Sequence, residues 1–330
     1  MHTKTLFIIL IVLIFQSCNV STSKFRKDQS IDAATRGEIK TLNDKLFNGI
    51  TTNNLTELKS LMLPALADKF GSDLDKSIKQ IGDLQIDNYS ILDEYSNHAS
   101  AAGIIITLPS GNNDDNDYFF TYGCPSKDSY VSLLLLNNIG NQFLLTAVYG
   151  KYPEGWKLNI FKLAQYSCFG KTAPDYFKMA QVSYKKSYLI DAVNDISLSN
   201  VLLRPAGDHL QFVNEKEIKD FEDSLMEDVN GRYQLPLTLT AIDSKPKVFR
   251  IFPQPIQEGF FPMICYLTDI NLKDTVALRL ENKNIRKEVD SIFTGIDKDK
   301  RFIFYRAFNE MPAEQKTVNY HGFVDTLMNR

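Results

Sequence analysis

The residues best suited to acid–base chemistry lie in one predicted strand. Asp93 and Glu94 are adjacent carboxylates in a segment whose apolar residues alternate from Tyr89 to Tyr95. Neighbouring side chains of a strand point to opposite faces of a sheet, so these two carboxylates cannot share a proton. Asp93 shares the face of Ile91 and Tyr95, which would point it inward, as the role of a general acid or base requires. An exposed Asp beside aromatic core residues is the interpretation that we favour.

Motifs for metal binding and for nucleophilic catalysis are incomplete. None of the 4 histidines lies within four residues of another histidine or of a cysteine, so no zinc-binding frame can be written. The acidic segment 113–117 lacks the glycine and the glutamate of an EF-hand loop and favours a solvated hairpin turn. Ser183 and Lys186 match Ser-x-x-Lys, but no Ser-Asp-Asn or Lys-Thr-Gly accompanies them. We therefore expect no metal, no cofactor and no enzymatic activity.

The most specific signal lies in the first 18 residues. Lys4 precedes the unbroken apolar run 6–15, and Ser17 stands directly before Cys18. A short basic region, an apolar region and a small residue in this order are typical of a secretory signal peptide. The run of 10 apolar residues is too short to cross a bilayer, which takes about 20. The segment therefore predicts export, in preference to a buried core strand.

Residues Phe15 to Cys18 resemble the lipobox of bacterial lipoproteins, with Phe15 in place of the usual Leu and Gln16 in place of a small residue. The resemblance implies removal of residues 1–17 and a diacylglycerol on the Cys18 thiol, often with an N-terminal acyl chain such as palmitate. Two or three acyl chains anchor a protein stably. Asn19 is not the Asp linked in some bacteria to inner-membrane retention, which favours the outer membrane, facing the periplasm. Ordinary cleavage to a soluble product is the alternative.

Composition and charge indicate a folded protein without affinity for nucleic acid. The chain has 330 residues, of which 44% are hydrophobic and 23% charged, which excludes a disordered or low-complexity protein. Single cores stop growing at roughly 250–300 residues, so this length suggests two domains. The net charge of -3 leaves no whole-chain basic field to attract nucleic acid.

Hydrophobic spacing divides the mature chain into four segments. Residues 18–36 have no apolar period and predict a flexible tether. Helical spacing followed by a meander of five or six strands predicts an α+β domain over 37–170. Residues 171–205 predict a helical hairpin linker, and 206–330 a second α+β domain. The expected fold class is therefore α+β, with two antiparallel-sheet domains, helices packed on one face of each sheet, and a helical hairpin between them.

The order of helices and aromatic strands, ending in the hairpin at Gly155-Trp156-Lys157-Leu158, resembles the nuclear-transport-factor-like cone. This cystatin-like fold is also used by SnoaL-like cyclases, and the resemblance covers about residues 37–165. It implies an open mouth lined by Asp93, Tyr95, Tyr122 and Trp156, where such cyclases place a catalytic Asp or His. Two alternatives stay open on this basis: a pocket enzyme with Asp93 as general base, and a carrier for a small apolar ligand.

Three cysteines remain after removal of the signal peptide: Cys124, Cys168 and Cys265. An oxidising periplasm allows at most one disulfide among them. Cys124 and Cys168 are predicted near strand ends of the same domain and would be the pair if a disulfide forms, but we favour three small buried thiols.

Together the features of the sequence predict a non-enzymatic, lipid-anchored protein of the bacterial envelope. Its expected partners are the membrane, through Cys18, and an envelope protein or ligand.

Overall fold

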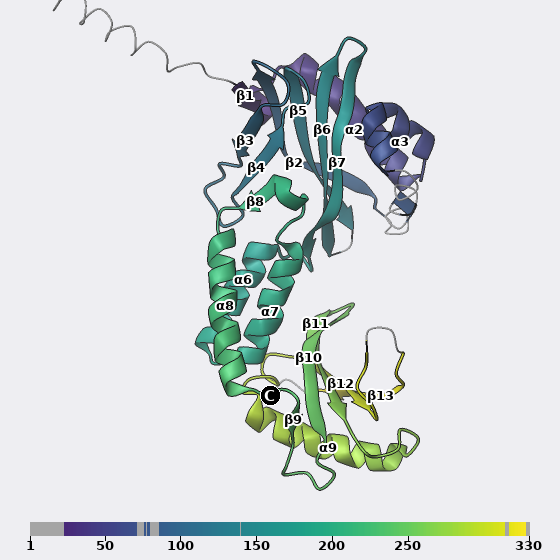
Figure 1. Ribbon diagram of the computed structural model, residues 1–330, viewed down its shortest axis with the longest axis vertical. Helices are drawn as coiled ribbons and strands as arrows, with labels where there is room; N and C mark the ends of the chain where they lie inside the picture. Colours follow the sequence, from purple (N-terminus) through teal and green to yellow (C-terminus); the bar gives the residue numbers. More distant parts are fainter. Residues whose placement is uncertain are drawn as a thin grey trace, which may run out of the picture. The chain divides into compact units, whose positions relative to one another are not determined.

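The computed structural model describes residues 23–70, 76, 78–79, 86–138, 140–313 and 317–327 (Figure 1). The predicted signal peptide, Cys18 and the start of the predicted tether lie outside these ranges. The chain divides into two compact units, which are described separately below. The first unit comprises the chain up to Asn113 together with Asp117–Tyr166 and Arg204–Gln211, and the second comprises Asp114–Asn116, Ser167–Leu203 and the chain from Phe212 onward.

A five-stranded antiparallel sheet forms the centre of the first unit. Its strand order is β1-β2-β5-β6-β7. The strands are β1 (Ser23–Lys27), β2 (Asn88–Ala99), β5 (Asp128–Asn138), β6 (Asn141–Tyr152) and β7 (Gly155–Cys168). Apolar side chains on both faces of β5 are buried, so both faces of the sheet are covered.

Helices cover one face of this sheet, as the sequence predicts. They are α2 (Ala33–Thr51), α3 (Leu55–Leu61) and α4 (Pro64–Phe70). Helix α2 begins after Asp32, whose side chain accepts a hydrogen bond from the Thr35 amide. Its buried stripe includes Ile39 and Leu46, which belong to the same core as Leu134 of β5. Burial of such a stripe is what stabilises an amphipathic helix on a sheet.

A second, smaller sheet covers the other face of the large sheet, whereas the sequence predicted a single meander of five or six strands. It has the order β3-β4-β8, with β3 (Ile105–Pro109), β4 (Tyr118–Gly123) and β8 (Leu210–Phe212). Strand β4 turns Tyr118, Phe120 and Tyr122 inward, and the hydroxyls of Tyr118 and Tyr122 hydrogen-bond to groups on β2 and β5. Strands β3 and β4 therefore leave the large sheet, and β2 pairs directly with β5. Alternation predicts a strand but does not identify its partner strand.

The predicted tether is wrong for residues 23–36. Strand β1 pairs antiparallel with β2 from Ser23 to Lys27, a short 3-10 helix η1 (Asp28–Ser30) follows, and α2 begins at Ala33. The three central side chains of β1 are exposed, so the strand carries no apolar alternation. Backbone hydrogen bonds to β2 hold it, and these do not depend on side-chain type.

The second unit begins with three packed helices, α6 (Ala173–Lys185), α7 (Leu189–Leu202) and α8 (Glu215–Arg232), seen side by side in Figure 1. Helices α6 and α7 form the predicted hairpin. Thr172 caps α6 by accepting a hydrogen bond from the Asp175 amide. The ring of Phe221 on α8 packs edge-on against Phe177 and Tyr184 of α6, at centroid distances of 5.5 and 5.6 Å. The hairpin is thus part of a larger helical layer. The chain then returns to the first unit, where a 3-10 helix, η2 (Gly207–His209), precedes β8.

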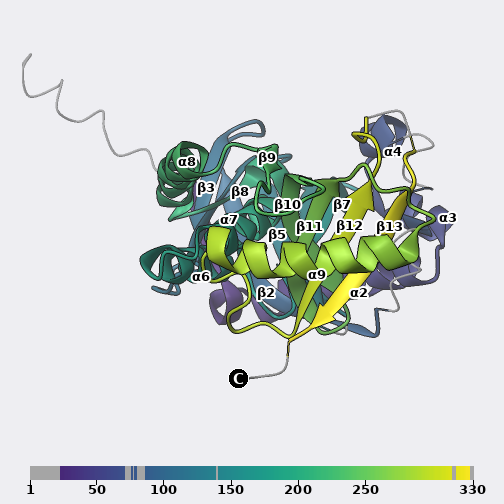
Figure 2. The ribbon, with the colours of Figure 1, turned by 90° about the horizontal axis from the view of Figure 1, so that it is seen from below.

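A mixed sheet with one covering helix completes the second unit. Its order is β13-β12-β11-β10-β9. The elements are β9 (Leu237–Thr238), β10 (Lys247–Ile256), β11 (Gly259–Leu267), α9 (Thr275–Ile292), β12 (Phe302–Phe308) and β13 (Tyr320–Thr326). Figure 2 shows α9 lying across the sheet. Strands β11 and β12 pair in parallel, unlike the antiparallel sheet that was predicted, because α9 is a crossover between them.

The fold class predicted from the sequence is confirmed, since both units combine helices with sheets that are mainly antiparallel. Within the part of the chain that the structure describes, no helix is long and apolar enough to span a membrane.

Candidate functional site

Asp93 lies between the two sheets of the first unit and is only 3% exposed. Its Oδ1 is 2.6 Å from Nζ of Lys27. Its Oδ2 accepts a hydrogen bond from the Tyr118 hydroxyl and lies 3.4 Å from the hydroxyl oxygen of Tyr95. Burial raises the pKa of Asp93, and the hydrogen bonds from Lys27 and Tyr118 oppose that rise. The carboxylate is therefore satisfied by groups of the fold itself.

Asp93 points inward, so the exposed position favoured from the sequence is wrong, and a bulge in β2 is the reason. Ile91 pairs with Leu134 and Asp93 pairs with Leu133, so Leu92 is an extra residue in β2. The bulge places Asp93 on the face opposite to Ile91, which is 43% exposed. The predicted shared face of Ile91 and Asp93 is wrong, because an extra residue shifts the alternation by one.

Glu94 occupies the helix-covered face, as expected for a neighbour of Asp93. Its Oε1 is 2.6 Å from Nε of Arg36 on α2, and its Oε2 accepts a 2.6 Å hydrogen bond from Tyr130. The two adjacent carboxylates are thus separated by the sheet and compensated independently.

The structure brings together three of the four residues predicted to line a pocket. Asp93 and Tyr95 are neighbours, and Tyr122 lies in the same inter-sheet layer, where its hydroxyl is 2.9 Å from Oγ of Ser129. Trp156 lies on the helix-covered side, since its Nε1 donates a 3.0 Å hydrogen bond to Glu38 of α2. None of the four lines either of the two cavities described below.

A cavity that the sequence did not reveal lies in the second unit and has a volume of about 220 Å³. Helices α6 and α7, strands β10 and β11, and the segment after α9 form its walls. Its polar wall contains Ser183, Lys186, Tyr188, Asp191, Asn194, Asp195, Lys298, Asp299 and Lys300. Its apolar wall contains Met179, Leu198, Pro253, Phe260, Phe261 and Pro262.

Asp191 and Lys300 form the first pair of charges in this cavity. Lys300 Nζ is 2.6 Å from Oδ2 of Asp191, and each side chain is 14% exposed. Lys300 also donates hydrogen bonds to the carbonyl oxygens of Gly295 and Lys298. Oδ1 of Asp191 is buried and has no hydrogen-bond partner among the residues that the structure describes. One oxygen of this carboxylate is therefore unsatisfied.

Asp195 lies one helical turn further along α7. Its Oδ2 accepts a 3.2 Å hydrogen bond from the Ser183 hydroxyl. Burial and the negative charge of Asp191 raise the pKa of Asp195 to about 7. In the described part of the chain no lysine or arginine forms an ion pair with it. The cavity thus holds a carboxyl group that changes charge near neutral pH, a property that clusters at functional sites.

Sequence spacing holds a partial signal for this site. Asp191 and Asp195 are four residues apart in a predicted helix, a spacing that places two side chains on one face. The sequence does not show that this face lines a cavity together with residues of β10 and β11. Ser183 and Lys186 both line the cavity, yet Ser183 donates to Asp195 and Lys186 lies 3.7 Å from Asp299. They do not form a Ser–Lys catalytic pair.

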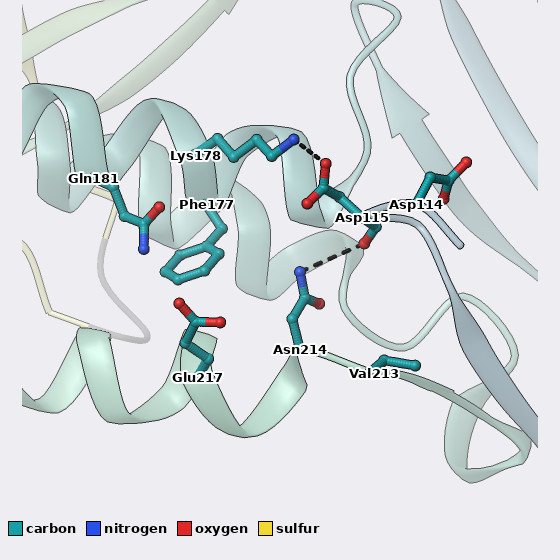
Figure 3. Close-up of a pocket in the computed structure, with 8 residues that line it drawn as sticks. All are labelled: Asp114, Asp115, Phe177, Lys178, Gln181, Val213, Asn214 and Glu217. Atoms are coloured by element: carbon teal, nitrogen blue, oxygen red, sulfur yellow. Dashed lines mark hydrogen bonds and ion pairs between the residues drawn. The ribbon is translucent and has the colours of Figure 1, made fainter. Parts of the chain in front are cut away.

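A second cavity, of about 260 Å³, lies beside α6 and α8 (Figure 3). Lys178 reaches Asp115 to form an ion pair, and Asn214 donates a 3.5 Å hydrogen bond to the carbonyl oxygen of Asp115. Lys178 and Asp115 are about half exposed, so this pair adds little stability. Among the described residues that line this cavity, none is a buried carboxyl comparable to Asp195.

Cysteines and metal ligands add no further site. The possible Cys124–Cys168 disulfide is absent from the described part of the chain, and Cys265 also forms none there. Cys124 follows β4 of the first unit, and Cys168 ends β7 at the border between the two units. Across the described ranges, no group of three His, Cys, Asp or Glu side chains is arranged to hold a metal ion.

Comparison with known proteins gives no family assignment. No family model matches the chain, and no match is found among curated proteins or solved structures.

Proposed function

We propose that this chain is a lipoprotein of the bacterial envelope that is anchored through Cys18 and binds a partner or ligand without catalysing a reaction. The observation that carries the proposal is the order of Lys4, the apolar run 6–15, Ser17 and Cys18. Acyl chains on Cys18 would contribute about 0.8 kcal/mol per buried CH₂, enough for stable anchoring when two or three chains are present.

The start of the folded chain is consistent with such an anchor. Strand β1 begins at Ser23, so only residues 19–22 separate it from Cys18. The five steps from the Cα atom of Cys18 to that of Ser23 span at most about 18 Å in a fully extended chain. A lipid on Cys18 would therefore hold the first unit close to the membrane surface, where it can contact another envelope protein.

The environment of Asp93 supports a binding role over catalysis in the first unit. A general base must reach its substrate, and Asp93 is enclosed between two sheets with Lys27 and Tyr118 as partners. Its carboxylate joins β1, β2 and β4. We assign Asp93 a structural role, and the binding function is expected elsewhere on the protein.

Membrane fractionation tests the anchor. The wild type, Cys18→Ala and the control Cys168→Ala are expressed in a bacterium, and the outer and inner membranes are separated by density. The wild type and the control are expected in the outer membrane, and Cys18→Ala is expected to lose that location. In-cell crosslinking of the wild type is then expected to capture an envelope protein. Equal distribution of wild type and Cys18→Ala would overturn the proposal.

A further inference from the structure

We infer that the cavity beside α7 binds a small organic amine, with its ammonium group between Asp191 and Asp195 and its apolar part against Phe260 and Phe261. This inference goes beyond the proposed function and does not rest on the lipid anchor. It rests on the shape of the cavity and on the charges of its walls.

The two walls of the cavity suit the two ends of such a molecule. Asp191 and Asp195 lie on α7, and Phe260 and Phe261 lie on β11. The cavity, of about 220 Å³, is smaller than the roughly 300–1,000 Å³ of pockets for drug-sized ligands, which favours a small molecule. Aromatic rings also attract cations through their π faces.

The interior of the cavity lacks one positive charge. Lys300 compensates Asp191, and within the described ranges Asp195 has only the hydrogen bond from Ser183. Oδ1 of Asp191 has no partner in the same ranges. A buried carboxylate without a counter-charge is costly, so a cation that reached both groups would be stabilised by them.

The rim of the cavity does not supply this charge. Lys186 lies near Asp299, and Lys298 lies 2.7 Å from Asp297. The side chains of Lys186, Lys298 and Asp299 are more than half exposed. The rim is therefore close to neutral, and the negative charge lies inside. An anionic ligand would meet Asp191 and Asp195 without compensation.

Amine binding is coupled to loss of a proton from Asp195. Burial and Asp191 favour the neutral form of this carboxyl, whereas Lys300 and Lys171 favour the charged form. The nearby Tyr176 hydroxyl stays neutral, because its pKa is raised mainly by burial. An ammonium ion binds the charged form of Asp195. The affinity should therefore rise about tenfold per pH unit up to pH 7 and change little above it.

Isothermal titration calorimetry of the purified full chain tests this inference. The probe is 2-phenylethylamine, with 2-phenylethanol as the neutral analogue and phenylacetate as the anionic one. The amine is expected to bind at least tenfold more tightly than either analogue. At pH 6 its binding should release close to one proton, detected with two buffers of different ionisation enthalpy, and at pH 8 almost none.

Two variants distinguish amine binding in this cavity from amine binding elsewhere on the protein. Asp195→Asn keeps an acceptor for Ser183 but cannot become negative, and it should weaken amine binding at pH 8 at least tenfold. Asp223→Asn changes an exposed carboxylate of α8 that does not line the cavity, and it should leave the affinity within twofold. Thermal unfolding confirms that each variant is folded. Absence of amine binding, equal binding of the neutral analogue, or unchanged affinity in Asp195→Asn would each overturn the inference, whether or not Cys18 carries lipid.

Discussion

Lys27 Nζ lies 2.6 Å from Oδ1 of Asp93, and this ion pair joins the edge strand β1 to the interior of the first unit. The Asp93 side chain is 4% exposed and that of Lys27 is 24% exposed, so the pair is shielded mainly on the carboxylate side. The central side chains of β1 are exposed, and the Phe25 ring meets the buried Tyr95 edge-on, so β1 is attached to the interior by this ion pair and by an aromatic contact.

Lys27→Met is expected to destabilise the first unit. The change leaves the buried Asp93 carboxylate without its cation, and removal of one partner from a buried pair costs roughly 3–5 kcal/mol. Because Lys27 is partly exposed, we expect a loss of about 2–3 kcal/mol in the free energy of unfolding at pH 7, measured with urea. Lys24→Met, on an exposed position of the same strand, is the control and should cost less than about 0.5 kcal/mol. Equal losses for the two variants would contradict a specific role for the pair.

Asp195 makes stability decrease as pH rises. Its pKa is about 7 in the folded chain, against 3.8 for an unperturbed Asp side chain, so the folded state holds the extra proton between these values. The contribution of Asp195 to the free energy of unfolding is fully present below pH 3.8. It falls by up to about 4 kcal/mol as pH rises from 3.8 to 7.

Asp195→Asn should remove this pH dependence. Compared with the wild type, the variant is expected to be more stable at pH 8, and the difference should shrink toward pH 4. Urea unfolding at pH 4, 6 and 8 gives the comparison. A difference that is independent of pH would show that Asp195 titrates normally.

Lys300→Gln is expected to destabilise the second unit. The variant leaves Asp191 and Asp195 as two neighbouring carboxyls without the ammonium group that pairs with Asp191, and both pKa values should rise further. We expect a loss of about 2–3 kcal/mol at pH 8 and a smaller loss at pH 5, where Asp195 is neutral. Lys298→Gln, from the more exposed pair with Asp297, provides the matched control and should cost under about 1 kcal/mol. A larger loss in the free energy of unfolding for Lys298→Gln than for Lys300→Gln would contradict the role assigned to Lys300.

Asn43→Ala tests the attachment of α2 to the large sheet. The Asn43 side chain donates a 3.0 Å hydrogen bond to Ser132 and accepts a 2.9 Å hydrogen bond from Tyr149. All three residues are buried, so the variant leaves two hydroxyl groups unsatisfied, at about 1–3 kcal/mol each. Asn48→Ala, at a less buried position of the same helix, should have little effect in the same thermal unfolding assay. Similar unfolding temperatures for the two variants would contradict this assignment.

Local sequence patterns predicted which segments form helices and strands better than they predicted which strands pair with one another. The spacing of Ile39 and Leu46 correctly predicted α2, because an amphipathic stripe is visible within one segment. The separation of β3 and β4 from the large sheet was not predictable in this way, since a strand's alternation is the same in either sheet. The bulge at Leu92 and the pairing of β1 likewise depend on contacts with β2 and β5.

The candidate site shows the same limit. Asp93 could be selected from its strand, but its partners Lys27 and Tyr118 come from distant segments. Asp191 and Asp195 have visible helical spacing, and only the packing of β11 and of the segment around Lys300 makes them members of a cavity. Burial and charge compensation arise from tertiary structure, so spacing alone could not rank these carboxylates.

The most direct test of the central proposal is the mass of the N-terminal peptide of the mature wild-type chain, isolated from a bacterium. A peptide that begins at Cys18 and carries the mass of a diacylglycerol, with or without an N-acyl chain, is the predicted result. A peptide that retains residues 1–17, or that begins elsewhere without lipid, would contradict the anchor and the envelope function built on it.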